Sequence, residues 1–324
     1  MSKIENTFIG FSLADALGVP VEFLTRENLK QNPLDKMIGY GCYGQPEGTW
    51  SDDSSLGFCL ADSLCNGYDL KDIAQNFVAW KNEEIWTPHG YVFDIGNQTR
   101  NAIYLLNDIL ENKDYKALKV LKYDQDERTN GNGSLMRIIP LLFYIKGKPI
   151  KEQFEIIWEV SALTHPHIRS AMACLIYLKF AEFVYDGLSL KKAYTKMKDV
   201  VNSFFVESEI SKNETQLFDR ILKNNIQNYK ENEIKTQGYV LYTLEASFWC
   251  LLNTDSYLDS VFKAINLGED TDTTACVVGG VAGMFYGLKK VPKKWINNLA
   301  RIDDIKKLSM RFNKKYGKKI FDVF

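Results

Sequence analysis

The chain has 324 residues, with 40 lysines and arginines against 41 aspartates and glutamates, so its formal net charge at pH 7 is −1. A charge balance this even excludes a strongly basic protein, and we expect no nucleic-acid partner. Hydrophobic residues make up 45% of the chain and charged residues 25%, which is typical of a globular protein with a large core. The six cysteines include no Cys-x-x-Cys pair, which favours free thiols in a reducing cytoplasm.

Membrane insertion and export are not expected. The longest nearly uncharged run, residues 275–288, is interrupted by glycines and is shorter than the roughly 20 residues of a membrane-spanning helix. Residues 1–6 contain no basic segment followed by an apolar core, so the sequence predicts no export signal. We therefore expect a cytoplasmic protein without a membrane partner, and we take a monomer as the starting hypothesis.

Apolar residues recur mainly with helical periodicity, whereas the alternation typical of strands is scarce. The sequence therefore predicts an all-α fold, in a single domain over residues 1–324, because no linker, low-complexity tract or repeat divides it. Residues 202–238 are the most polar stretch and are expected to form a variable helical excursion. In chain order the expected helices are 6–17, 54–66, 70–81, 99–110, 134–143, 151–163, 168–185, 190–204, 214–225, 240–251, 257–267, 273–287, 293–300 and 302–314.

Two of these helices carry small residues at every fourth position. Residues four apart lie on one helix face, so each stripe allows another backbone to approach closely. Glycine inside a helix costs about 1 kcal/mol relative to alanine, and a close contact would offset that cost. We predict that both helices are central to the fold and that at least one stripe faces a neighbouring helix. The stripes are Gly10, Ala14 and Gly18 in the first helix and Ala275, Gly279, Gly283 and Gly287 in the second.

Two acidic clusters, residues 51–53 (Ser-Asp-Asp) and 270–273 (Asp-Thr-Asp-Thr), each open an expected helix more than two hundred residues apart. Carboxylates packed this closely repel one another unless a cation neutralises them, and oxygen ligands favour Mg²⁺ or Mn²⁺. For the first cluster, helix capping and metal binding are equally good interpretations. For the second cluster metal binding is favoured, because one cap does not need two aspartates and two threonines.

Glu22 is a third candidate. It stands between Val21 and Phe23, just past the first glycine-striped helix. A lone glutamate in apolar surroundings is expensive to bury unless it is paired or meets a cation. The alternative is a loop glutamate that faces solvent.

Two loops and one histidine could contact a ligand. Residues 131–134 (Gly-Asn-Gly-Ser) precede an expected helix, where glycines let the backbone approach closely and free N–H groups favour anions. A plain loop with a helix cap is the alternative. Asp94, Gly96 and Asn97 form the second loop, for which turn capping is an equally good interpretation of Asp94. His165 has no partner at zinc-ligand spacing, so the sequence predicts no zinc site.

Taken in chain order, several segments of this sequence resemble those of the ADP-ribosylglycohydrolase family. The resemblance covers nearly the whole chain. Any one motif is weak, whereas the ordered set is highly specific. The matching segments are residues 10–18 with Pro20 and Glu22, 48–53, 94–97 with Thr99, 130–137, 164–167, 238–240 with 243–245, and 266–274.

The resemblance implies an all-α, orthogonal helical domain with two magnesium ions, or manganese in their place, at the bottom of an ADP-ribose cleft. The implied reaction is hydrolysis of the glycosidic bond between ADP-ribose and a modified protein side chain or small conjugate, which passes through an oxocarbenium-like state. By matching position, the implied metal ligands are Ser51, Asp52, Asp53, Asp270, Asp272 and Thr273. The implied catalytic residues are Glu22, Asp52 and Asp53. The implied substrate contacts are Asp94, Gly96, Asn97, Gly131, Asn132, Gly133, Ser134 and His165.

Two positions depart from the family pattern. Ser51 stands where the family usually has threonine, a change that keeps the hydroxyl. Glu269 stands where the family often has glycine, and it adds negative charge beside the expected site. The sequence does not reveal whether Glu269 alters substrate preference or simply faces water.

Two other functions remain open at this point. One is a non-catalytic ADP-ribose-binding protein, such as a toxin-immunity protein, and the other is a dinuclear phosphohydrolase that cuts the diphosphate. A complete set of oxygen ligands disfavours the pure binder. The sequence leaves open which carboxylate acts as the base and whether the linkage is to arginine, serine, an acetyl group or nucleic acid.

Overall fold

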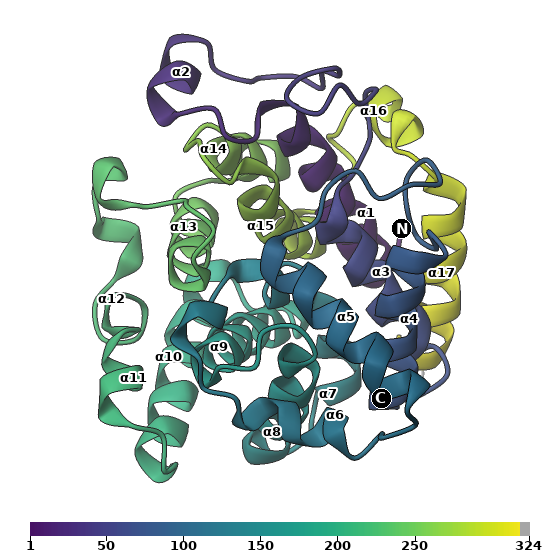
Figure 1. Cartoon of the computed structure of the whole chain (residues 1–324). Coiled ribbons are helices and arrows are strands. Elements are labelled where there is room, and N and C mark those ends of the chain that lie inside the picture. The colour runs from purple at the N-terminus through teal and green to yellow at the C-terminus, as the bar shows by residue number, and fades with distance from the viewer. Residues whose placement is uncertain (318–324) are drawn as a thin grey trace, which may run out of the picture.

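The structure is a computed structural model that describes residues 1–317 (Figure 1). Within this range no strand forms, and one isolated bridge joins Gly131 to Tyr239. The all-α prediction is confirmed. The α-helices are α1 (Lys3–Gly18), α2 (Arg26–Gln31), α3 (Asp52–Leu64), α4 (Leu70–Asn82), α5 (Asn97–Glu111), α6 (Ala117–Val120), α7 (Leu142–Ile145), α8 (Ile150–Ala162), α9 (Ile168–Tyr185), α10 (Leu190–Glu207), α11 (Lys212–Gln216), α12 (Asp219–Leu222), α13 (Val240–Leu252), α14 (Tyr257–Ile265), α15 (Thr271–Tyr286), α16 (Lys293–Asn298) and α17 (Ile302–Tyr316). The 3₁₀ turns are η1 (Val19–Val21), η2 (Leu121–Tyr123), η3 (Glu127–Thr129), η4 (Asn132–Ser134), η5 (Ile139–Leu141), η6 (Ile226–Asn228) and η7 (Glu231–Glu233).

The two glycine-striped helices, α1 and α15, pack against each other along their stripes. A Cβ atom on Gly279 would lie 2.5 Å from the Gly10 carbonyl oxygen and 2.4 Å from the Ala14 Cβ atom. A Cβ atom on Gly283 would lie 2.3 Å from the Asn6 carbonyl oxygen. No side chain fits at these separations, so both stripes are needed for the contact. Both helices are almost entirely buried, which confirms the prediction that they are central.

The helix expected over residues 134–143 is not formed. The segment instead contains η4, η5 and the start of the short helix α7. Pro140 explains the break, because proline lacks the N–H group and clashes with the preceding turn of an α-helix. Arg137 lies in this segment fully buried, and its Nη2 atom donates to the carbonyl of Val160 and the hydroxyl of Thr164.

The excursion expected over residues 202–238 is helical only in part. Helix α10 continues to Glu207. The prediction of one helix over 214–225 is wrong, because α11 and α12 are separate short helices. Two tertiary contacts bend the segment between them. Glu214 on α11 accepts hydrogen bonds from the Arg169 guanidinium at 2.6 and 2.8 Å, and Phe218 is completely buried.

No helix in residues 1–317 combines the length and the apolar character that crossing a membrane demands. The six cysteines, all within the described residues, are free. Figure 1 shows α1, α3 and α15 side by side, with the starts of α3 and α15 on the same side of the molecule as the end of α1. The packing of α1 on α15 therefore brings the two acidic clusters into one region.

Candidate active site

The start of α3 is held by residues from two parts of the chain. Ser51 is the N-cap, and its Oγ atom accepts a hydrogen bond from the Asp53 amide at 3.3 Å. The carboxylate of Asp15 on α1 accepts hydrogen bonds from the Ser51 and Ser54 amides at 3.0 and 3.1 Å. Because these acceptors already satisfy the start of the helix, the carboxylates of Asp52 and Asp53 are not needed for capping.

Asp15 is a site residue that sequence reasoning missed. It is fully buried, and burial raises its pKa to about 7 against the effect of its hydrogen bonds from Ser51 and Ser54. One signal could have found it: Asp15 is the only charged residue between Glu5 and Glu22. A lone charge in an apolar helix needs a structural or functional partner.

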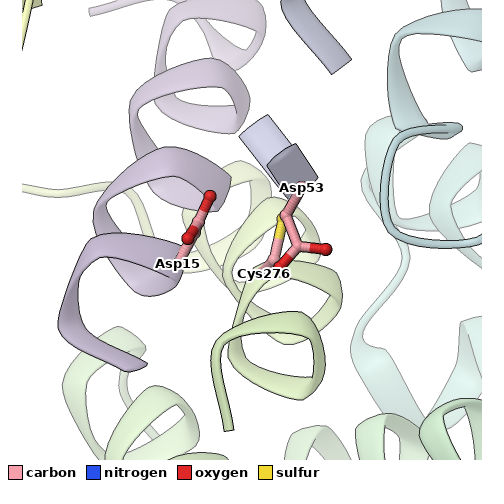
Figure 2. A group of neighbouring side chains, drawn as sticks. All are labelled: Asp15, Asp53 and Cys276. Carbon is pink, nitrogen blue, oxygen red and sulfur yellow. The ribbon is translucent and has the colours of Figure 1, made fainter. Parts of the chain in front are cut away.

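Figure 2 shows Asp15, Asp53 and Cys276, which come from α1, α3 and α15. One carboxylate oxygen of each aspartate and the Cys276 sulfur lie within 4.8 Å of one another. This group does not suit Mg²⁺, because sulfur is a soft ligand and the Asp15 oxygens already accept hydrogen bonds. Burial also raises the pKa of the Cys276 thiol well above its usual value, which keeps it protonated.

A second group consists only of carboxylates. Glu22 follows η1, Asp270 precedes α15 and Asp272 lies in the first turn of α15, and one oxygen of each lies within 4.8 Å of the others. Glu22 is buried, and its Oε2 atom has no hydrogen-bond partner among the described residues. An orphaned, buried carboxylate oxygen is costly unless a cation completes its surroundings. This all-oxygen donor set fits Mg²⁺ or Mn²⁺.

The two acidic clusters meet through hydroxyl groups. The Thr273 Oγ1 atom donates a hydrogen bond to Asp53 Oδ1 at 3.1 Å, and Ser51 Oγ donates to Asp53 Oδ2 at 3.3 Å. The Asp270 side chain makes no capping hydrogen bond at the start of α15. Ser51 and Thr273, which are far apart in the sequence, therefore both bond to the Asp53 carboxylate. Helix capping alone does not explain the second cluster.

Asp94 joins the group from the loop before α5. Burial raises the pKa of Asp94, and the polar side chains of Tyr43 and Asp52 oppose the rise. Tyr43 lies within hydrogen-bonding reach of both Asp94 and Glu22. Tyr43 was not predicted as a site residue, because nothing in its local sequence sets it apart.

The site is strongly acidic. Within residues 1–317 no lysine, arginine or histidine forms a salt bridge with the carboxylates of this site. Burial, followed by the charges of Asp94 and Asp270, raises the pKa of Glu22 to about 8. Burial and neighbouring carboxylates also raise the pKa of Asp52, Asp53 and Asp272 well above the usual range. A divalent cation would relieve this repulsion.

The loop of residues 131–134 reaches the carboxylates through one side chain. The Asn132 Nδ2 atom donates to Asp270 Oδ2 at 2.7 Å and to Thr243 Oγ1 at 2.9 Å. Gly133 packs against the His165 ring, because a Cβ atom there would lie 2.6 Å from His165 Cε1. His165 is buried, and burial followed by the charge of Arg137 lowers its pKa to about 3, so the imidazole is neutral.

Known proteins are similar to this chain in sequence and in architecture. Residues 1–320 match the family model for ADP-ribosylglycohydrolase. The chain belongs to the ADP-ribosylglycohydrolase family. ADP-ribosylarginine hydrolase Tri1 of Serratia proteamaculans (strain 568) is 30% identical to this chain over 315 residues. The match covers 95% of this chain and 78% of that protein.

Other members of the ADP-ribosylglycohydrolase family align over most of their length. The ADP-ribosyl-(dinitrogen reductase) glycohydrolase of Rhodospirillum rubrum is 24% identical over 297 residues, which cover 90% of this chain and 88% of that protein. The solved structure of an ADP-ribosylglycohydrolase-related protein complex superposes with a TM-score of 0.77 at 25% identity, and the match covers 98% of each chain. The helical architecture is therefore that of the family.

Two of the substrate contacts implied by the family resemblance have other partners. Ser134 is fully buried, and its Oγ atom lies 3.7 Å from the Cys174 sulfur. Asn97 is exposed at the start of α5, and its Oδ1 atom accepts a hydrogen bond from Arg100 Nη1 at 2.9 Å. Neither hydroxyl nor amide forms a hydrogen bond with the acidic cluster in the described residues. Because α-helical structure begins only at Leu142, the α-helix start that was expected after residue 134 is not formed there.

Proposed function

We propose that this protein is a Mg²⁺-dependent hydrolase that cleaves the glycosidic bond between ADP-ribose and a modified protein side chain or small conjugate. One observation carries the proposal: oxygen-bearing side chains from four distant segments converge, and none of their carboxylates forms a salt bridge with a lysine or arginine in residues 1–317. The family membership and the names of the relatives supply the substrate class. The free thiols and the absence of a paired cysteine are consistent with a reducing cytoplasm.

The two acidic clusters, residues 51–53 and 270–273, would together hold two divalent ions, either Mg²⁺ or Mn²⁺. The Oε2 atom of Glu22, which has no hydrogen-bond partner among the described residues, supports a cation beside it. When bound, such ions polarise the ribose hydroxyls and lower the pKa of a bound water. The proposed ligands are Ser51, Asp52, Asp53, Asp270, Asp272 and Thr273, with Glu22 beside them.

The side chains of the protein perform the remaining tasks. Glu22, Asp52 and Asp53 provide negative charge next to the ribose, which stabilises the positive charge that develops on the anomeric carbon as the glycosidic bond breaks. One of these carboxylates accepts the proton of the attacking water. Asn132 fixes Asp270 through its hydrogen bond, and His165 supports the Gly131–Gly133 backbone that would face the rest of the ADP-ribose.

The test is a product analysis with a panel of ADP-ribosylated substrates, with and without EDTA. We expect free ADP-ribose as the product, and we expect EDTA to abolish its formation. AMP and ribose phosphate would indicate a phosphohydrolase instead. Tight binding of ADP-ribose with no product from any substrate would indicate a binding or immunity protein.

A further inference from the structure

The side chain of Arg26 joins three separate segments of backbone. Arg26 is the first residue of α2, and its guanidinium donates to three carbonyl oxygens: Nε to Leu267 at 2.8 Å, Nη1 to Glu231 at 2.7 Å and Nη2 to Ile234 at 2.6 Å. Within residues 1–317 it forms no salt bridge. All three nitrogen atoms of the planar group are thus used to hold main chain.

Each of these segments leads to the acidic site. Arg26 lies four residues after Glu22, and Leu267 lies three residues before Asp270. Ile234 lies four residues before Gly238, and a Cβ atom on Gly238 would lie 3.3 Å from Asp270 Oδ2. The guanidinium therefore holds main chain three residues before Asp270, and Arg26 itself lies four residues after Glu22.

Backbone hydrogen bonds extend the same connection toward the site. The Phe23 amide donates to the Glu269 carbonyl at 2.7 Å, and the Glu269 amide donates to the Leu24 carbonyl at 2.8 Å. The Asp270 amide donates to the Thr236 carbonyl at 3.3 Å. These pairs fix the segment after Glu22 against the segment before Asp270.

The backbone in this network is strained. Phe23 and Glu269 both have a φ angle of 64°, in the left-handed region that side chains other than glycine rarely adopt. Such a conformation is strained and persists only where surrounding contacts determine it. No residue with a side chain fits at Gly268, because a Cβ atom there would lie 2.6 Å from the Arg26 amide nitrogen.

We propose that Arg26 is a positioning residue that holds Glu22 and Asp270 close enough to share a divalent cation. Without a cation the carboxylates repel one another, and Glu22 lies in a loop that could move away. The three hydrogen bonds of Arg26 oppose that movement from outside the site. This inference depends on the proposed function, because it assigns Arg26 a task in assembling the metal centre.

The experiment compares Arg26→Lys and Arg26→Gln with a matched control, Arg311→Lys. Arg311 pairs with Asp62 through a half-exposed side chain at α17, away from the acidic site. Lysine keeps the charge but cannot join three carbonyls in one plane. We expect both Arg26 variants to need at least tenfold more Mg²⁺ for half-maximal turnover and for half-maximal thermal stabilisation. At saturating Mg²⁺, the KM for the ADP-ribosylated substrate should change less than twofold.

A purely structural role would lower the melting temperature without changing the Mg²⁺ requirement of the folded enzyme, and that result would overturn the proposal. If the variants do not fold, amide hydrogen exchange of the metal-free wild type decides. Slow amide exchange at Phe23 and Glu269 would show that the segments of Glu22 and Asp270 are held together before a cation binds, as proposed. Rapid exchange would contradict the proposal. If the wild type binds Mg²⁺ without turnover, the proposed function fails while the Mg²⁺ and exchange measurements still test Arg26. If it binds no Mg²⁺, both proposals fail.

Discussion

Gly18 and Asp272 are in direct backbone contact, because a Cβ atom on Gly18 would lie 2.5 Å from the Asp272 Cα atom. The end of α1 and the first turn of α15 therefore approach as closely as two helices can. Asp272 points toward Glu22, which lies four residues after Gly18. The glycine stripe thus positions the candidate site as well as the core.

Replacing Gly18 with alanine should separate α1 from α15 at the point where the carboxylates meet. We expect Gly18→Ala to lower the free energy of unfolding by about 1–3 kcal/mol, as overpacking usually does. The Mg²⁺-induced rise in melting temperature should also shrink. Gly57→Ala is the control, because its Cβ atom would make only ordinary contacts, at 3.4 Å, with the Phe11 ring. Equal melting temperatures for Gly18→Ala and the wild type would contradict the close contact.

Replacing Asp272 with asparagine should separate catalysis from stability. The change removes one negative charge from a buried, repulsive group, so we expect the metal-free variant to be at least as stable as the wild type. Turnover should fall on the order of 100-fold or more, because a metal ligand is lost. Asp303→Asn, on an exposed side chain of α17, is the control. Unchanged Mg²⁺-dependent turnover would remove Asp272 from the metal centre.

The sequence predicted the framework of this fold well, because its strongest signals are local. The spacing of Gly10, Gly279 and Gly283 records a backbone contact that no larger residue could make. The prediction of a helix over 134–143 was wrong for a reason that is visible in the sequence, because Pro140 cannot continue an α-helix. The 214–225 segment failed because Glu214 bonds to Arg169, a residue far away in the chain, and periodicity does not report such contacts.

The candidate site was predictable only in part. The clusters around Asp53 and Asp272 stand out by charge, whereas their convergence followed from the family resemblance and not from periodicity. Tyr43 and Arg26 were not predicted as site residues, because their tertiary contacts leave no local pattern in the sequence. Asp15 was a different case, since its isolation in an apolar helix was visible in the sequence.

Mg²⁺ should stabilise the folded protein, with a free energy that rises with the logarithm of its concentration above its Kd. A ligand that binds only the folded state adds about 2.7 kcal/mol to the free energy of unfolding at a concentration 100 times its Kd. We expect thermal denaturation to show this increase with MgCl₂ or MnCl₂ and to lose it with EDTA. NaCl at matched ionic strength serves as the control, because a screening effect would be the same for both salts. Identical shifts with NaCl would show that no specific site is filled.

Gly133 and His165 should behave as one unit. A Cβ atom on Gly133 collides with the His165 ring, so we expect Gly133→Ala to cost about 1–3 kcal/mol of stability and to reduce turnover. His165→Ala removes the obstacle, and the double variant should recover part of the loss in stability. A double-mutant cycle with denaturant unfolding measures the coupling, which we expect to exceed 0.5 kcal/mol, at the lower end of the range for residues in contact. Strict additivity would mean that the ring does not limit this position.

Glu245 on α13 should make stability depend on pH. Burial raises its pKa from 4.5 to about 7 in the folded protein, although the Arg220 Nε atom lies 3.2 Å away and opposes the rise. Because the folded state binds this proton more tightly than the unfolded state, the stability that Glu245 contributes is fully present below pH 4.5. It is lost as the pH rises toward 7. We expect Glu245→Gln to reduce the decline in unfolding free energy between pH 5 and pH 8, measured in saturating Mg²⁺ so that the metal-site carboxylates stay ionised. A wild-type decline that Glu245→Gln leaves unchanged would mean that Glu245 is already charged at pH 5, held by Arg220.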